Sequence, residues 1–246
     1  CLFTVDEETG LTGANELEKN FFSGKILINL DSEDEGELFI GCAGGVDTLA
    51  TFAYDTEKVP TNSTAFRLTV KGLKGGHSGD DIDKGLGNSI KIINRFLWRG
   101  VNSYDLRLSM LDGGNLRNAI PREAYAIFTI HEEDRAALRK EFTLIKNDIL
   151  AELHDVEPDL SITFENADLP PYVVDEPTQY DLLNALYACP HGVISMSRQL
   201  KGLVETSTNL ASVKFIQDNQ ILVTTSQRSS VESAKKDISN MVESVF

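Results

Sequence analysis

The stretch Phe66-Arg67-Leu68-Thr69-Val70 alternates apolar and polar side chains, which is typical of a strand with one buried face. A glycine-rich turn follows it, and the apolar positions beyond that turn recur with the spacing of a helix. The elements predicted after the turn are a helix over 82–98, strands over 106–111 and 124–130, a helix over 135–153 and a strand over 160–164. This β-α-β-β-α-β order indicates a ferredoxin-like unit, also called a split βαβ arrangement.

A second α+β unit is predicted beyond residue 177. Two proline-containing segments, 169–171 and 175–177, separate it from the first unit. Its expected elements are a helix over 179–188, strands over 193–197, 211–216 and 221–225, and a final helix from residue 230. We therefore expect residues 45–246 to form two related, ferredoxin-like α+β units packed side by side.

Residues 1–44 precede these units and predict part of an α/β layer. Apolar runs at 2–5 and 26–30 are expected as strands, with a helix over 14–22 between them. A further strand over 37–42 runs into a Cys-Ala-Gly-Gly turn. Because such a segment is too small to bury a parallel sheet on both faces, we expect it to be only part of an α/β domain.

The composition of the 246 residues argues against several classes of protein. The net charge of −15, from 23 basic and 38 acidic residues, argues against nucleic acid binding, which needs clustered lysine and arginine. No apolar run approaches the roughly 20 residues that span a bilayer, so no membrane partner is expected. The three cysteines form no Cys-x-x-Cys pair, which favours a reducing cytoplasm over a disulfide framework or a thiolate zinc site.

Two acidic clusters each follow an apolar run. Glu7 and Glu8 stand after residues 2–5, and Asp31 opens a second cluster after residues 26–30. Hydrolysis by a metal-bound water needs oxygen or imidazole ligands and a base that is not itself a ligand, and adjacent glutamates can divide these tasks. The alternatives are a solvated loop for the glutamates and an acidic turn or weak calcium loop for Asp31.

The turn Gly72-Leu73-Lys74-Gly75-Gly76-His77-Ser78-Gly79-Asp80 leaves one histidine uncrowded ahead of a helix. His77 can there donate a hydrogen bond to a developing oxyanion. The alternative is a helix N-cap formed by Ser78 or Asp80, with His77 merely at the surface.

Two polar side chains further along the chain are candidates for substrate contacts. Asn118 lies between two predicted strands and can donate from its amide to a carbonyl or a carboxylate. Arg228 lies beside the last predicted strand and can clamp a carboxylate with two parallel hydrogen bonds. Ordinary turn chemistry is the alternative for Asn118, and an ordinary salt bridge is the alternative for Arg228.

Together these motifs resemble one enzyme family. Asp-Glu-Glu-x-Gly at 6–10, the cluster at Asp31, Gly-Gly-His-Ser-Gly at 75–79 and Asn-Ala-Ile-Pro at 118–121 resemble the co-catalytic zinc metallopeptidases, which include aminoacylases, glutamate carboxypeptidases and carnosinase. Further segments at 41–45, 202–207 and 227–231 make the sequence most similar to the aminoacyl-histidine (Xaa-His) dipeptidases. The resemblance extends over nearly the whole chain.

The resemblance implies a role for each candidate. It implies Glu7 as general base, Glu8 as a ligand of one metal and Asp31 as a ligand of the other. It implies His77 as a lid histidine that steadies the tetrahedral intermediate, and Asn118 as a lid residue that binds substrate. The implied cofactors are two divalent metals, zinc in the first place, with cobalt or manganese as alternatives.

Departures from the family pattern carry expectations of their own. Many relatives carry an arginine near the place of His131, so carboxylate binding by Arg228 is an inference from this sequence rather than from the family. Such enzymes also need a histidine and an aspartate ahead of the acidic pair and a late histidine ligand. We therefore expect a central portion of a longer enzyme: residues 1–44 from its catalytic domain and 45–246 as a doubled lid.

This interpretation predicts that the portion alone binds no metal tightly and hydrolyses nothing. The expected partners are a dipeptide substrate and, through the lid, a second copy in a homodimer. The alternatives are a non-catalytic lid and dimerisation module, or an amide hydrolase of aminoacylase-like or carboxypeptidase-like specificity.

Overall fold

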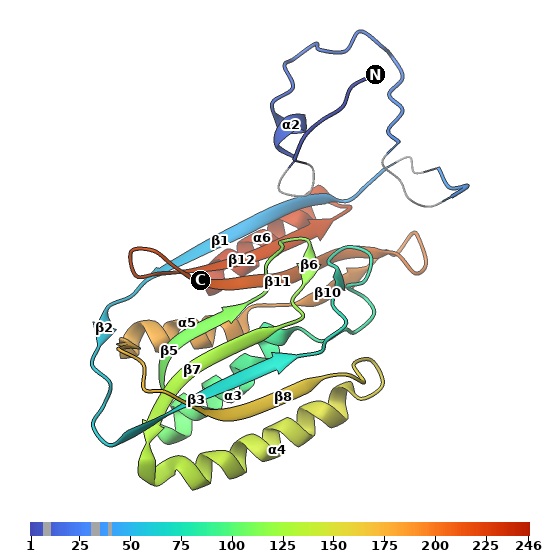
Figure 1. The fold of residues 1–246 in the computed structure, drawn as a ribbon. Helices are drawn as coiled ribbons and strands as arrows, with labels where there is room; N and C mark the ends of the chain where they lie inside the picture. The colour runs from blue at the N-terminus through green and yellow to red at the C-terminus, as the bar shows by residue number, and fades with distance from the viewer. Residues whose placement is uncertain (7–10, 31–34, 39–40) are drawn as a thin grey trace. The chain divides into compact units, whose positions relative to one another are not determined.

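The protein is described by a computed structural model that covers residues 1–6, 11–30, 35–38 and 41–246 (Figure 1). The chain divides into two compact units, Cys1–Gly41 and Cys42–Phe246. The boundary predicted from the sequence lay between residues 44 and 45.

The first unit contains little regular structure among its described residues. Its one helix there is α2, Thr12–Asn15, far shorter than the predicted helix over 14–22. The strands predicted at 2–5 and 26–30 are wrong, and Phe3 and Leu30 are 90% and 89% exposed. A strand needs a hydrogen-bonded neighbour, and the described residues of this unit provide none. The strand predicted over 37–42 falls partly outside the described residues, and its described residues are not a strand.

The second unit is built on one antiparallel sheet of eight strands, in the order β1-β12-β11-β5-β7-β3-β8, with β10 also paired to β11 (Figure 1). The strands are β1 (Gly44–Ala53), β3 (Ser63–Lys71), β5 (Arg107–Gly113), β7 (Ala124–His131), β8 (Ser161–Ala167), β10 (Gly192–Met196), β11 (Val204–Ile216) and β12 (Gln220–Ser229). Two short ladders lie apart from it and pair β2 (Thr56–Glu57) with β9 (Val173–Val174), and β4 (Gly76–His77) with β6 (Ala119–Ile120).

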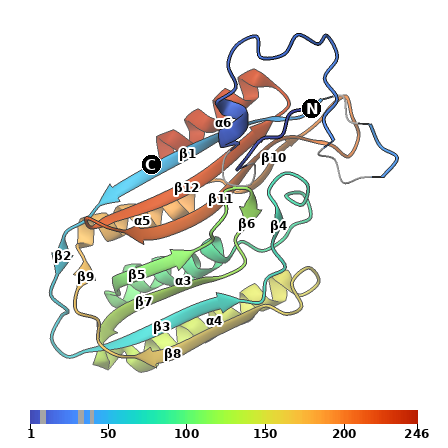
Figure 2. The same cartoon turned by 45° about the horizontal axis from the view of Figure 1, so that its top comes forward.

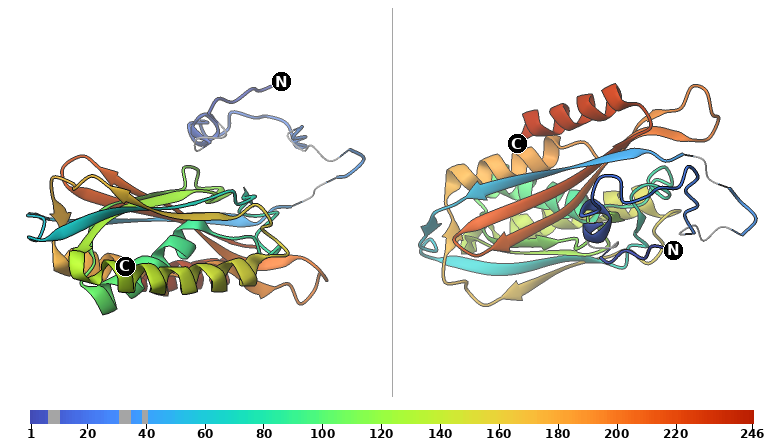
Figure 3. Two further views of the ribbon diagram at one scale, coloured as in Figure 1. Left: turned by 60° about the horizontal axis from the view of Figure 1, so that its bottom comes forward. Right: turned by 90° about the horizontal axis from the view of Figure 1, so that it is seen from above.

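Helices cover one face of this sheet (Figure 3). They are α3 (Ser89–Tyr104), α4 (Arg135–Leu153), α5 (Glu176–Ala188) and α6 (Glu232–Val245), with a 3₁₀ turn η1 (Glu132–Asp134) ahead of α4. The core lies between the helices and the sheet, where rings such as Phe66, Phe96 and Phe128 are fully buried. This arrangement follows from the alternation of the strands, which directs every second side chain to the helix-covered face.

The strand order separates a first half, β3 to β8, from a second half made of β1, α5, β10, β11, β12 and α6. The predicted α+β class is confirmed for this unit. In the first half, the strand order is β5-β7-β3-β8. Strand β7 lies between β3 and β5, which α3 connects, and β3 lies between β7 and β8, which α4 connects; the intervening strand is antiparallel in each case. The second half does not repeat that order, because β1 lies at the sheet edge beyond β12, so a second ferredoxin-like unit is wrong.

Two differences from the predicted elements have local causes. The helix predicted over 82–98 begins at Ser89, because the Asn88 side chain accepts from the backbone N–H groups of Ile90 and Lys91. That cap excludes Ser78 and Asp80 as the helix cap. Strand β1 was not predicted, because its opening Gly44-Gly45 has the composition of a turn.

The two halves meet at a seam between β5 and β11, and Gly113 and Val213 are the only ladder pair that joins these two strands among the described residues. On the helix-covered face, α3 ties the seam to α5: the Asn94 amide donates to the Leu183 carbonyl at 2.9 Å, and the Trp98 ring nitrogen donates to Asn184 at 2.8 Å. Because one ladder pair is weak, side-chain contacts hold much of this junction.

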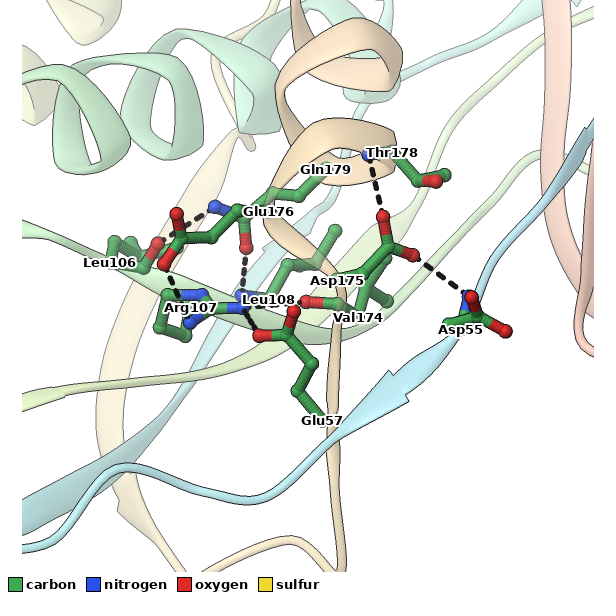
Figure 4. A network of polar contacts seen from close by, with 10 residues as sticks. All are labelled: Asp55, Glu57, Leu106, Arg107, Leu108, Val174, Asp175, Glu176, Thr178 and Gln179. Atoms are coloured by element: carbon green, nitrogen blue, oxygen red, sulfur yellow. Dashed lines mark hydrogen bonds and ion pairs between the residues drawn. The ribbon is translucent and has the colours of Figure 1, made fainter.

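A polar cluster closes one end of the seam (Figure 4). The Arg107 guanidinium on β5, only 7% exposed, donates to Glu57 and Glu176 and to the Val174 carbonyl. These partners lie on the two chain segments that cross between the halves. Gln179 on α5 also bonds the backbone on both sides of Arg107, as Figure 4 shows. The cluster therefore holds both of these connecting segments against strand β5.

Candidate functional site

Strand β4, which carries His77, pairs with β6, and β6 lies beside β11 of the second half of the sheet (Figure 2). The backbone N–H of His77 donates to Asp81 at 2.7 Å, and its ring Nδ1 lies 2.9 Å from Asp80 Oδ2. The ring is 38% exposed. Hydrogen bonds from Lys84, and then from the His77 N–H, hold the pKa of Asp81 below its usual value, so this carboxylate anchors the turn in its ionised form.

Arg228 on β12 meets His77 from the other half. Its Nη2 lies 3.5 Å from His77 Nε2, although the two residues are 151 positions apart in the chain. Both guanidinium and imidazole can donate to an anion. The Asp80 N–H donates to His77 Nδ1 at 3.3 Å, which places the proton of the neutral ring on Nε2, the nitrogen that faces the arginine. Arg228 has no ion-pair partner among the residues that the structure describes, so the ordinary salt bridge of the alternative interpretation is not formed there.

Gly79 makes room for this pair. A Cβ atom at Gly79 would lie 2.8 Å from Arg228 Nη1 and 3.2 Å from His77 Cε1. The glycine-rich turn therefore does more than relax the backbone. It lets the guanidinium approach the imidazole ring.

Asn118 lies on the loop 114–121, which contains β6, and directly precedes that strand. Its carbonyl accepts from the Ser78 N–H at 2.7 Å, and β6 pairs Ala119 with His77. The backbones of Asn118 and His77 are thus brought together, a contact that the sequence did not predict. The loop and β4 form one small polar unit at the seam, with Arg228 facing it.

The remaining predicted site residues Glu7, Glu8 and Asp31 lie outside the described residues. Within the part of the chain that is described, no group of three or more His, Cys, Asp and Glu side chains could hold a metal ion. His131 lies 3.7 Å from Asp105, and His154 is exposed beside Asp155. The predicted metal ligands are therefore neither tested nor replaced by this structure.

Sequence reasoning missed Asn209 and His191, which come from the second half. The Asn209 amide on β11 donates to the carbonyls of Ala119 at 2.8 Å and Arg117 at 3.4 Å. His191 precedes β10, and its Nδ1 lies 3.3 Å from the Asn88 amide nitrogen and 3.4 Å from the Leu210 N–H. Neither residue stands in a recognisable motif, and each acquires its partners only through the long-range pairing of the sheet.

Burial lowers the pKa of His191 to about 4, and the nearby Lys91 ammonium adds to this effect. Lys91 itself donates to the Leu186, Tyr187 and Cys189 carbonyls at the end of α5, and burial lowers its pKa. The imidazole therefore stays neutral in the folded protein at neutral pH, with Nδ1 as an acceptor.

We expect this histidine to make the fold less stable in mild acid. Between pH 6.5 and pH 4 an unfolded histidine binds a proton that folded His191 does not, so lowering the pH favours unfolding. From pH 7 to pH 5 the free energy of unfolding should fall by about 1–2 kcal/mol more in the wild type than in His191→Gln, by urea titration. The exposed His154 gives the control, since His154→Gln should keep the wild-type pH dependence. Equal pH dependence in all three proteins would contradict the assignment of this loss of stability to His191.

None of the helices in the described part of the chain combines the length and apolar character that crossing a bilayer requires.

Comparison with known proteins places these features in context. Residues 61–156 match the family model described as "Peptidase dimerisation domain". The chain is 38% identical over 244 residues to the cytosol non-specific dipeptidase of Escherichia coli K12, covering 99% of this chain and 50% of that protein. The crystal structure of aminoacylhistidine dipeptidase from Vibrio alginolyticus matches with a TM-score of 0.86 and 40% identity, over 98% of this chain and 49% of that one. The chain thus spans about half the length of these relatives.

Proposed function

We propose that the complete protein hydrolyses dipeptides, preferentially those with a C-terminal histidine, because residues 61–156 match a peptidase dimerisation domain and nearly all of the chain matches two dipeptidases. The names of the two relatives support a dipeptide substrate, and the name of the Vibrio enzyme supports the histidine preference. The relative named for the cytosol supports a cytoplasmic location.

The observation that carries the proposal is the approach of His77 to Arg228 across the seam, at 3.5 Å. A dipeptide ends in a carboxylate close to its only peptide bond. Arg228 binds that carboxylate through two parallel hydrogen bonds, and its lack of an ion-pair partner among the described residues leaves it available. His77 and Asn118 then donate to the peptide oxygen as charge develops on it.

We propose two zinc ions as cofactors, with Glu8 as a ligand of one and Asp31 as a ligand of the other. When bound, such ions lower the pKa of water and polarise a carbonyl. Glu7, next to Glu8 in the sequence, accepts the proton of the attacking water as general base. Two ligands do not complete a two-metal site, so residues 1–246 alone are expected to bind zinc weakly and to be inactive.

A panel of substrates tests the proposal. The complete protein, supplied with zinc, cobalt or manganese, is assayed on Xaa-His dipeptides, on other dipeptides and on N-acyl amino acids. Rapid hydrolysis of dipeptides, fastest for Xaa-His, supports the proposal. Faster hydrolysis of N-acyl amino acids shows an aminoacylase-like enzyme instead, and no hydrolysis of any substrate contradicts it.

A second candidate function is association of two copies through the first half, which works as a ferredoxin-like lid. The supporting observation is the match of residues 61–156 to a domain described as a dimerisation domain. The edge of β5, however, is already paired with β11 of the same chain. Sedimentation equilibrium of the chain tests this candidate function. A dimer at micromolar concentration supports association, and a monomer indicates that the second half occupies the place of a partner.

A further inference from the structure

The loop 114–121 is held by the second half of the sheet. Besides the Asn209 amide, two ion pairs reach it or its base: Arg117 with Asp47 at 3.0 Å, and Lys214 with Asp112 at 2.8 Å. The Lys214 ammonium also donates to Asn115 at 2.9 Å. The loop that carries Asn118 therefore takes its position from strands of the other half.

Among the side chains of the second half that make these contacts, that of Asn209 is the most buried. Asn209 is 1% exposed, whereas the side chains of Arg117 and Lys214 are 41% and 29% exposed. Exposed ion pairs are screened by water and contribute little to position. The Asn209 amide, in contrast, comes from a buried side chain, and its loss removes a donor that two loop carbonyl oxygens share.

The orientation of the Asn209 amide is fixed by its partners. Two carbonyl oxygens can accept only from the amide nitrogen, which excludes the flipped side chain. Its Oδ1 is buried without a hydrogen-bond partner among the described residues, which shows that the contact with the loop decides how the side chain lies.

Asn209 is also tied to Arg228 through the sheet. Along the β11–β12 ladder, Asn209 stands opposite Ser226, and Arg228 stands opposite Ser207. On its other side, the loop is bonded to the strand of His77 through Ala119 and through the Asn118 carbonyl. Asn209 therefore joins the strand pair of Arg228 to the unit that carries His77 and Asn118.

We infer that Asn209 is a positioning residue, which sets His77 and Asn118 at their distance from Arg228. Its catalytic consequence rests on the proposed function, but the geometry does not. In the substitution Asn209→Ala, the loop loses its buried donor and shifts, so that His77 and Arg228 separate. The kcat of hydrolysis by the complete protein is then expected to fall roughly 10-fold or more, because the reaction is slower when catalytic groups are misplaced.

Asn94 provides a matched control. It too is 1% exposed, donates its amide to one carbonyl across the halves and leaves Oδ1 buried without a partner among the described residues. Its contact joins α3 to α5, and it touches neither the loop nor β4 in any contact of the described residues. Asn94→Ala should therefore lose stability like Asn209→Ala and keep kcat.

The test of the geometry is NMR of the histidine rings in the 246-residue chain, without substrate or metal. We expect Arg228→Gln to move the His77 ring resonances in the wild-type chain and in Asn94→Ala, and to move them less than half as far in Asn209→Ala. If Asn209→Ala does not fold, Asn209→Ser, which keeps one donor, should show the same change at smaller size. An undiminished response to Arg228→Gln in both Asn209 variants overturns the inference, as does an equal loss in Asn94→Ala.

The kinetic test is separate. In the complete protein, Asn209→Ala should lower kcat while Asn94→Ala does not. If the complete protein hydrolyses no dipeptide, the proposed function fails, and the NMR result still decides whether Asn209 positions His77. A normal kcat in Asn209→Ala, with dipeptides hydrolysed by the wild type, contradicts the catalytic part of the inference.

Discussion

Replacing Gly114 with alanine is expected to destabilise the fold by at least about 3 kcal/mol. Gly114 has a φ of +64°, a left-handed conformation that costs an L-residue roughly 1–2 kcal/mol. An added Cβ would also lie 1.9 Å from the Ala211 carbonyl oxygen. Because that atom belongs to the backbone of β11, it cannot turn aside like a side chain, and β11 must move away from β5.

Gly85 gives the matched control for this prediction. Its φ is +68°, and no atom lies within 4 Å of a Cβ built there. Gly85→Ala therefore measures the backbone strain without the collision. Urea titration of both variants should show a free energy of unfolding at least about 2 kcal/mol lower for Gly114→Ala than for Gly85→Ala. Similar values for the two would show that the seam tolerates separation of its strands.

The second large effect is expected at Glu7. In the complete protein, Glu7→Gln should lower kcat for dipeptide hydrolysis by roughly 10³-fold, because the amide cannot accept the proton of the attacking water. The prediction rests on the sequence resemblance, since Glu7 lies outside the described residues. Tight zinc binding should persist, because the proposed base is not a ligand.

A nearby acid serves as its control. Glu16 is exposed and follows α2, and Glu16→Gln removes the same charge from the same unit. It should leave kcat unchanged. A fully active Glu7→Gln enzyme rules out Glu7 as the base, and an equal loss in Glu16→Gln would point to net charge instead.

Local patterns were sufficient for part of this structure. The helix predicted over 135–153 has the bounds of α4, because Leu138, Phe142 and Ile149 recur at helical spacing and face the core. The same reasoning failed in the first unit, where apolar runs at 2–5 and 26–30 have no neighbouring strand among the described residues. Apolar character predicts a strand only where a sheet is present to receive it.

Polar segments in the second half were harder to predict. The strand predicted over 211–216 begins at Val204 instead, and its unpredicted part carries the buried side chains of Thr206, Thr208 and Asn209. Their partners lie on other elements: the Thr206 hydroxyl bonds Ser229 on β12, and the Asn209 amide bonds the loop 114–121. Alternation of apolar residues does not mark such a strand.

The candidate site, too, could be predicted only in part. The turn of His77 and the loop of Asn118 were identified from their residue types. The approach of Arg228 was not, since it depends on the pairing of β12 with β11 and on the seam between β11 and β5. A candidate site assembled from two halves of a sheet becomes visible only when the long-range pairing is known.

The central claim is that this cross-seam site binds the free carboxylate of a dipeptide. It is tested most directly by comparing hydrolysis of an Xaa-His dipeptide and its C-terminal amide by the complete protein and by its Arg228→Gln variant. We predict that the wild type strongly prefers the dipeptide, and that Arg228→Gln lowers kcat/KM for the dipeptide by roughly 10²-fold while leaving the slow hydrolysis of the amide nearly unchanged. Equal losses on both substrates, or a variant as active as the wild type, would contradict the claim.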